Sequence, residues 1–76
     1  MSALSEKTLA LSVPYLGPAA KVFLERQTKF HLDGLAFDAL EPQHLADLAN
    51  WVRVSGALVV DPAKAAELSQ KIVAIK

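Results

Sequence analysis

The segment from residue 14 to residue 26 constrains the fold most strongly, because it joins a proline-punctuated turn directly to a helical pattern. Proline cannot donate a backbone hydrogen bond, and this loss is harmless only at the first position of a helix. Pro14 is therefore predicted to end a first helix over residues 6–13, or to let it continue with a kink. Pro18 is predicted to begin a second helix that runs to about Phe30.

Helix-breaking residues divide the rest of the chain into further helical segments. We expect a short helix over residues 35–40, a helix over residues 42–55 and a helix over residues 62–75. Asp33 and Asp61 are plausible N-caps, and Gly56 suits a helix end. The apolar run at residues 57–60 has no second strand to pair with, so we predict that it is a buried connector. In the turn between the first and second predicted helices, Gly17 is predicted to adopt a backbone conformation, or to lie so close to a neighbouring segment, that a side chain could not be accommodated.

The apolar residues recur with helical periodicity. In the segment 18–30, one broad face is predicted to carry Leu16, Ala19, Ala20, Phe23, Gln27 and Phe30, flanked by Val22 and Leu24. In the segment 42–55, Trp51 is predicted to be a core anchor against the second helix. The sequence therefore predicts an all-α single domain over residues 1–76, a small orthogonal bundle of four to five short helices.

Composition narrows the classes of function. The chain has 76 residues, no cysteine, 53% apolar residues and a formal net charge of zero. A domain of this size has a marginal core, so good packing or a partner chain must stabilise it. A neutral chain lacks the excess of positive charge that marks nucleic-acid binding proteins. No apolar run is long enough to span a membrane. Because Pro14 interrupts the N-terminal apolar run, we expect no signal peptide and a cytoplasmic protein.

The sharpest candidate for chemistry is Glu41-Pro42-Gln43-His44. Its Glu-x-x-His spacing is that of di-iron carboxylate proteins, whose complete sites need a second such pair and two further glutamates. The chain lacks these, so Glu41 and His44 are weak metal candidates that only an oligomer could complete. His31 and Asp33 have no nucleophile placed by a motif beside them. We therefore predict no enzyme and no cofactor, with a small metal- or ligand-binding protein using Glu41 and His44 as the alternative.

The favoured function is protein interaction or self-association. On the segment 62–75, one stripe of Ala65, Leu68, Ile72 and Ile75 is sufficient for a core, and a second stripe of Ala66, Ser69 and Val73 lies nearly opposite. Surplus apolar surface of this kind is typical of interfaces. We expect a homodimer or a complex with another protein. The predicted interaction residues are Tyr15, Val22, Leu24, Ala66 and Val73.

Residues 14–24 read Pro-Tyr-Leu-Gly-Pro-Ala-Ala-Lys-Val-Phe-Leu. This segment resembles the tyrosine, aliphatic, glycine, proline, aliphatic, alanine, basic pattern of a small helical domain appended to bacterial signalling proteins such as serine/threonine kinases and sensors. Ala19 departs from the larger aliphatic residue of that pattern. The resemblance implies a non-catalytic accessory or interaction module of bacterial origin, with no catalytic residues.

Overall fold

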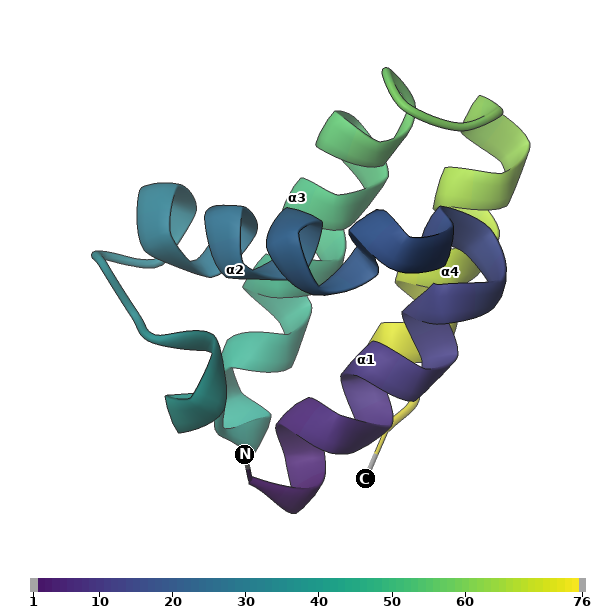
Figure 1. Ribbon diagram of the computed structural model, residues 1–76. Helices are drawn as coiled ribbons and strands as arrows, with labels where there is room; N and C mark the ends of the chain where they lie inside the picture. Colours follow the sequence, from purple (N-terminus) through teal and green to yellow (C-terminus); the bar gives the residue numbers. More distant parts are fainter. Residues whose placement is uncertain (1, 76) are drawn as a thin grey trace.

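The computed structural model describes residues 2–75, which form α-helices and short 3-10 turns without a β-strand (Figure 1). The α-helices are α1 (Ala3–Leu16), α2 (Ala20–His31), α3 (Leu45–Gly56) and α4 (Pro62–Val73). The 3-10 turns are η1 (Gly17–Ala19), η2 (Phe37–Ala39) and η3 (Pro42–His44). The predicted all-α class is therefore confirmed for the described part of the chain.

The first helix begins earlier and ends later than its sequence indicates. The Ser2 hydroxyl accepts a hydrogen bond from the Ser5 backbone N–H at 3.1 Å, which makes Ser2 the N-cap. Pro14 lies inside the helix, so of the two predicted alternatives the end at residue 13 was wrong and the helix continues through the proline. Its missing N–H would have bonded the carbonyl of Ala10, and Ala10 is exposed, so water can satisfy that carbonyl.

Gly17 turns the chain from α1 into α2. Its φ of 61° and ψ of −145° lie in a region that only glycine adopts without strain. An added Cβ would meet no heavy atom within 4 Å, so the backbone conformation requires the glycine and a close approach does not. Pro18 then lies in η1, and α2 begins at Ala20, two residues later than predicted. After this turn, α2 runs across the direction of α1 (Figure 1).

The buried face of α1 carries hydroxyl groups, which the apolar pattern did not predict. Ser5, Thr8 and Ser12 are each completely buried. Their hydroxyls donate to backbone carbonyls one turn earlier, those of the N-cap Ser2 and of Leu4 and Thr8 in the helix, at distances of 2.8 to 2.9 Å. Because these side chains are small and hydrogen-bonded within their own helix, neighbouring helices can pack closely against this face.

The buried face of α2 is rotated relative to the predicted one. Leu24 and Thr28 are completely buried, whereas Phe30, which was assigned to the core face, is 68% exposed. Gln27 is also buried, and its side-chain carbonyl has no hydrogen-bond partner in the described structure. Leu24, predicted as a flank of the apolar face, therefore lies at its centre.

Between α2 and α3, the predicted short helix is reduced to the single turn η2. Asp33 has a φ of 55° and belongs to the turn that ends α2, so it does not cap the following element as predicted. Phe37 from η2 and the adjacent Leu40 are both buried and complete one end of the core.

The helices α3 and α4 form the most extensive pairing in the fold. A Cβ added to Gly56 would lie 3.3 Å from the Cβ of Ala65, so the two helices nearly touch there. The Asp61 side chain accepts from the Ala63 N–H at 2.7 Å, which confirms the predicted cap of α4. The core contains Leu24, Phe37, Leu40, Leu45, Leu48, Ala49, Val52, Leu68 and Ile72.

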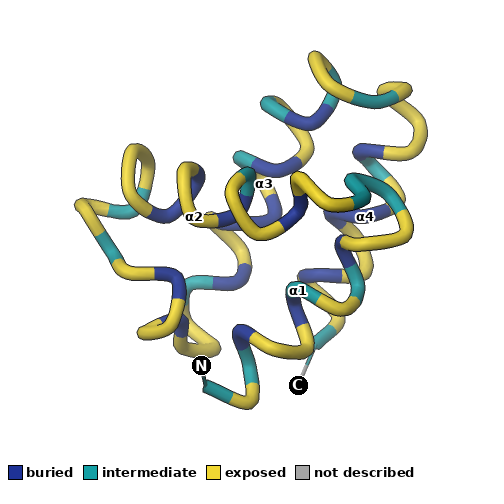
Figure 2. The backbone as a smooth tube through the Cα atoms, viewed as in Figure 1, coloured by how far each residue is buried: buried dark blue, intermediate teal, exposed yellow. Residues whose placement is uncertain are grey.

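The predicted buried connector at residues 57–60 is an exposed turn. Leu58 is 89% exposed and Val59 is 61% exposed, whereas Ala57 and Val60 at the two ends of the turn are half-buried (Figure 2). The N–H groups of Leu58, Val59 and Val60 bond to carbonyls of Ser55 and Gly56. The backbone of the turn is therefore satisfied locally, and it does not require a covering element.

Candidate interaction surfaces

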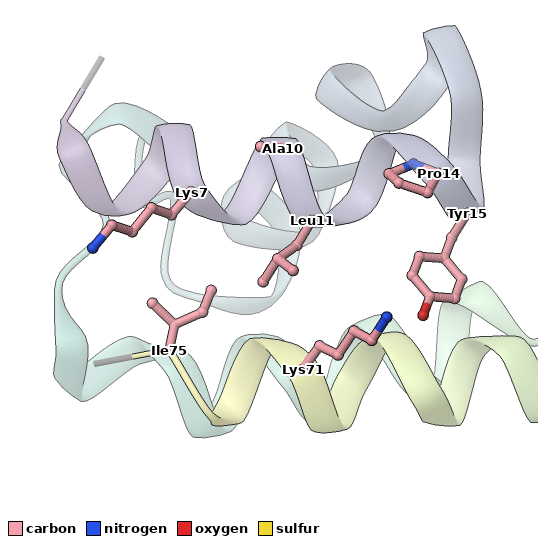
Figure 3. A pocket seen from close by; sticks show the side chains of 7 residues that line it. All are labelled: Lys7, Ala10, Leu11, Pro14, Tyr15, Lys71 and Ile75. Atoms are coloured by element: carbon pink, nitrogen blue, oxygen red, sulfur yellow. The ribbon is translucent and has the colours of Figure 1, made fainter.

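An open groove runs between α1 and α4 and has a volume of about 500 Å³. Its lining residues, drawn in Figure 3, are Lys7, Ala10, Leu11, Pro14, Tyr15, Lys71 and Ile75. Five of these seven side chains are apolar or aromatic, and the two charged ones are both lysines. The groove therefore combines an apolar lining with positive charge.

One end of the groove is organised by Tyr15. Its hydroxyl donates a short hydrogen bond to the Glu67 carboxylate, and the Lys71 ammonium lies 5.1 Å from the centre of its ring. The hydrogen bond from Tyr15 lowers the pKa of Glu67, and nearby Lys64 and Lys71 lower it further, against some desolvation. Hydrogen bonding with Tyr15 also raises the pKa of Lys71. These contacts hold the phenol ring between α1 and α4.

Lys7 marks the other end of the groove. In Figure 3, its ammonium points away from the end that Tyr15 occupies, and the side chains of Leu11 and Ile75 face one another between the two ends. Both Leu11 and Ile75 are half-buried, so part of each remains open to a ligand. The groove is thus apolar in the middle and has a lysine towards each end.

A second surface lies where α3 passes into the turn before α4. Val54, Leu58 and Val59 are 45%, 89% and 61% exposed, and we call these three residues the turn patch. Val54 lies in the last turn of α3, and Leu58 and Val59 lie in the turn that follows it. Leu58 contributes almost none of its surface to the protein core.

The predicted interaction residues lie in several places. Tyr15 lines the groove between α1 and α4, and Val22 is 52% exposed on α2. Val73 is 55% exposed on α4, and Ala66 is half-buried. Leu24 has no exposed surface, so its assignment to an interaction surface was wrong, and it belongs to the core.

The predicted second stripe on α4 is partly covered by α3. Ser69 is buried, and its hydroxyl donates to the Ala49 carbonyl of α3 at 2.8 Å. Val73 is the one exposed member of that stripe, with 55% of its surface accessible, and Ala66 is half-buried. Ser69 therefore pairs the two helices within one chain and does not belong to a surface stripe.

Glu41 and His44 meet, and their contact is a helix-capping one. Glu41 has an extended backbone before η3, and its N–H donates to Nδ1 of His44 at 3.0 Å. One imidazole nitrogen is therefore engaged by the backbone. Within residues 2–75, no three His, Cys, Asp or Glu side chains are grouped so that they could hold a metal ion.

His31 stacks on Trp51, a contact that periodicity did not predict. The ring centroids are 3.8 Å apart and the ring planes differ by 9°. Trp51 is only half-buried, and His31 is exposed. Trp51 was predicted to be a buried core residue, and that prediction was wrong. Through its contact with His31, Trp51 nevertheless links α3 to the end of α2.

Comparison with protein-family models, with curated proteins and with solved structures gave no match. Among residues 2–75, no helix has both the length and the apolar character needed to cross a lipid bilayer.

Proposed function

We propose that this chain is a non-catalytic protein-interaction and oligomerisation module that forms a homodimer. The observation that carries the proposal is the exposure of the turn patch, in which Leu58 is 89% exposed and Val59 is 61% exposed. The three exposed residues lie within one short segment at the end of α3, and exposed apolar surface gathered in this way is typical of surfaces that a partner covers. The formal net charge of zero adds no general repulsion between copies.

The turn patch is suited to contact between two identical copies. In a dimer with two-fold symmetry, the same patch on each copy meets its counterpart, so a small exposed patch can be covered by a single symmetric contact. Val22 on α2 and Val73 on α4 are exposed apolar residues outside the turn patch, where another protein could bind instead. Tyr15 lines the groove, and its hydroxyl is already hydrogen-bonded to Glu67. Tyr15 could therefore contact a partner only if that partner bound in the groove.

The wider context of the module is also part of the proposal. The pattern in residues 14–24 supports an accessory role in bacterial signalling, in the cytoplasm. The crossing of α1 and α2 at Gly17 supports classification as an orthogonal bundle of four short helices. The alternative of a metal site shared between copies through Glu41 and His44 has less support, because Nδ1 of His44 already accepts a backbone hydrogen bond.

Sedimentation velocity at micromolar concentrations tests the proposal. We expect a species of twice the 8.2 kDa chain mass, and a monomer for the double variant Leu58→Ser/Val59→Ser. The matched control is Val73→Ser, which removes an exposed valine from α4 and should leave the dimer intact. A wild-type monomer at all concentrations would refute self-association. A monomeric Val73→Ser variant would instead place the interface on α4.

A further inference from the structure

We propose that the groove between α1 and α4 binds a linear aliphatic carboxylate, with the carboxylate at Lys7 and the alkyl chain lying over Leu11 and Ile75. This proposal is independent of the proposed function, because no residue of the turn patch lines the groove. The groove is proposed to bind a small ligand, whereas the turn patch is proposed to contact a second chain.

The shape and lining of the groove favour an alkyl chain. A volume of about 500 Å³ lies within the range of small-molecule sites, which are mostly apolar with a few placed polar groups. Figure 3 shows Leu11 from α1 and Ile75, just beyond α4, facing one another across the groove. Lys7 and Tyr15 are eight residues apart on α1, a rise of about 12 Å. This length suits a medium-length alkyl chain and is short for a docked peptide helix of three turns, about 16 Å.

The charge of the groove favours an anionic head group. Lys7 and Lys71 are the charged residues in the lining, and no acidic residue is among the seven lining residues. A carboxylate placed beside a lysine gains a charge-assisted hydrogen bond, whereas an ammonium head group would be repelled. The ligand class is therefore an anionic amphiphile with a single carboxylate.

The two lysines are not equivalent. Lys71 lies against Tyr15 and one helical turn after Glu67, so its positive charge is partly balanced by the Glu67 carboxylate. A ligand carboxylate at that end would also approach the negative charge of Glu67. Lys7 has no acidic residue three or four positions away on α1. This asymmetry places the carboxylate at Lys7 and the end of the alkyl chain near Tyr15.

An NMR titration of the whole ¹⁵N-labelled chain with octanoate tests the proposal. We expect saturable shifts of the Leu11, Tyr15 and Ile75 amides, with little change in the turn patch. Decanoate has two more methylenes and should bind up to about fifteenfold more tightly, since each fully buried methylene contributes about 0.8 kcal/mol. The controls are 1-octanol and octylammonium, which share the alkyl chain and should bind more weakly.

Variants locate the carboxylate and the alkyl chain. Lys7→Gln should weaken octanoate binding about tenfold, whereas Lys71→Gln should weaken it less. Lys29→Gln is the matched control, because Lys29 is an exposed lysine on α2 that does not line this groove. Leu11→Asp should abolish binding, and its amide spectrum reports whether the fold persists. Lys7→Gln provides the decisive result if Leu11→Asp fails to fold.

Four outcomes would overturn the proposal. Equal binding of octanol or octylammonium would remove the case for an anionic ligand. Loss of binding in Lys71→Gln with none in Lys7→Gln would reverse the assigned orientation. Shifts confined to the turn patch would place the ligand elsewhere. Groove amides that shift with protein concentration alone would identify a second copy of the chain as the occupant.

Discussion

The hydroxyl of Ser69 in α4 donates a buried hydrogen bond to the backbone carbonyl oxygen of Ala49 in α3 at 2.8 Å. This bond joins residues twenty positions apart and lies within the most extensive helix pairing of the fold. Because the carbonyl belongs to the helix backbone, the bond fixes how far α4 is shifted along α3. A serine that the pattern assigned to a surface stripe is therefore part of the internal packing.

We predict that Ser69→Ala lowers the free energy of unfolding by about 1 kcal/mol relative to the control Ser55→Ala. Both changes replace a helical serine by alanine, so the effect of helix propensity is largely shared. Only Ser69 donates a hydrogen bond to another helix. Urea denaturation followed by circular dichroism measures the difference. Equal stabilities of the two variants would show that the bond contributes nothing.

The start of α4 and the turn at Gly17 could be predicted from the sequence, because each depends on local chemistry. Asp61 followed by Pro62 is a local start signal, and the structure confirms the cap. The positive φ of Gly17 is likewise a property of one residue in a short turn. The sequence left open whether the first helix ends at Pro14, and the helix continues because a proline in its last turn frees a carbonyl that water can reach.

Which face of each helix is buried could not be predicted as well. Ser5, Thr8 and Ser12 count as polar in any hydrophobic pattern, yet their hydroxyls are satisfied inside α1 and they are buried. Thr28 is also polar and lies outside the apolar face predicted for residues 18–30, yet the structure buries it completely. Burial of a small hydroxyl residue depends on which helix packs against it. This is decided by the tertiary structure and cannot be seen in the local sequence.

For the candidate surfaces too, the local features could be predicted from the sequence and the tertiary contacts could not. Tyr15 was predicted as a binding anchor and lies in the groove, but its partners Glu67 and Lys71 are more than fifty residues away in the sequence. The apolar residues 57–60 were predicted to be buried because hydrophobicity was the only signal. The turn that they form satisfies its own backbone and projects from the bundle, which no local pattern reveals.

We predict that Gly17→Ala lowers the free energy of unfolding by about 1 to 3 kcal/mol. The cause is conformational, since a residue with a Cβ is strained at a φ of 61° and a ψ of −145°. The control is Ala19→Ser, at an exposed neighbouring residue with an ordinary helical backbone, which should change stability by no more than about 0.5 kcal/mol. Thermal unfolding measures both. Unchanged stability of Gly17→Ala would show that the turn accommodates a side chain.

We predict a favourable coupling of about 0.5 to 1.5 kcal/mol between His31 and Trp51, from the stacking of their rings. A double-mutant cycle with His31→Ala and Trp51→Leu isolates this coupling from the other contacts of each residue. Trp51→Leu alone should cost less than truncation of a fully buried residue, because Trp51 is half-buried. Chemical denaturation of the four proteins measures the cycle. Additive effects would show that the stacked rings contribute no free energy.

We predict that Tyr15→Phe raises the pKa of Glu67 towards its ordinary value. The Tyr15 hydrogen bond is the largest cause of the lowered pKa, ahead of the charges of Lys64 and Lys71, so Lys71→Gln should raise the pKa less. A carboxyl whose pKa is lowered by folding stabilises the fold above its unfolded-state pKa, and this contribution is lost as the pH falls through the folded-state value. Tyr15→Phe should therefore weaken the acid dependence of stability in that pH range. NMR titration of the Glu67 side-chain carboxyl carbon measures the pKa directly, and an unchanged value in Tyr15→Phe would show that the hydrogen bond does not form in solution.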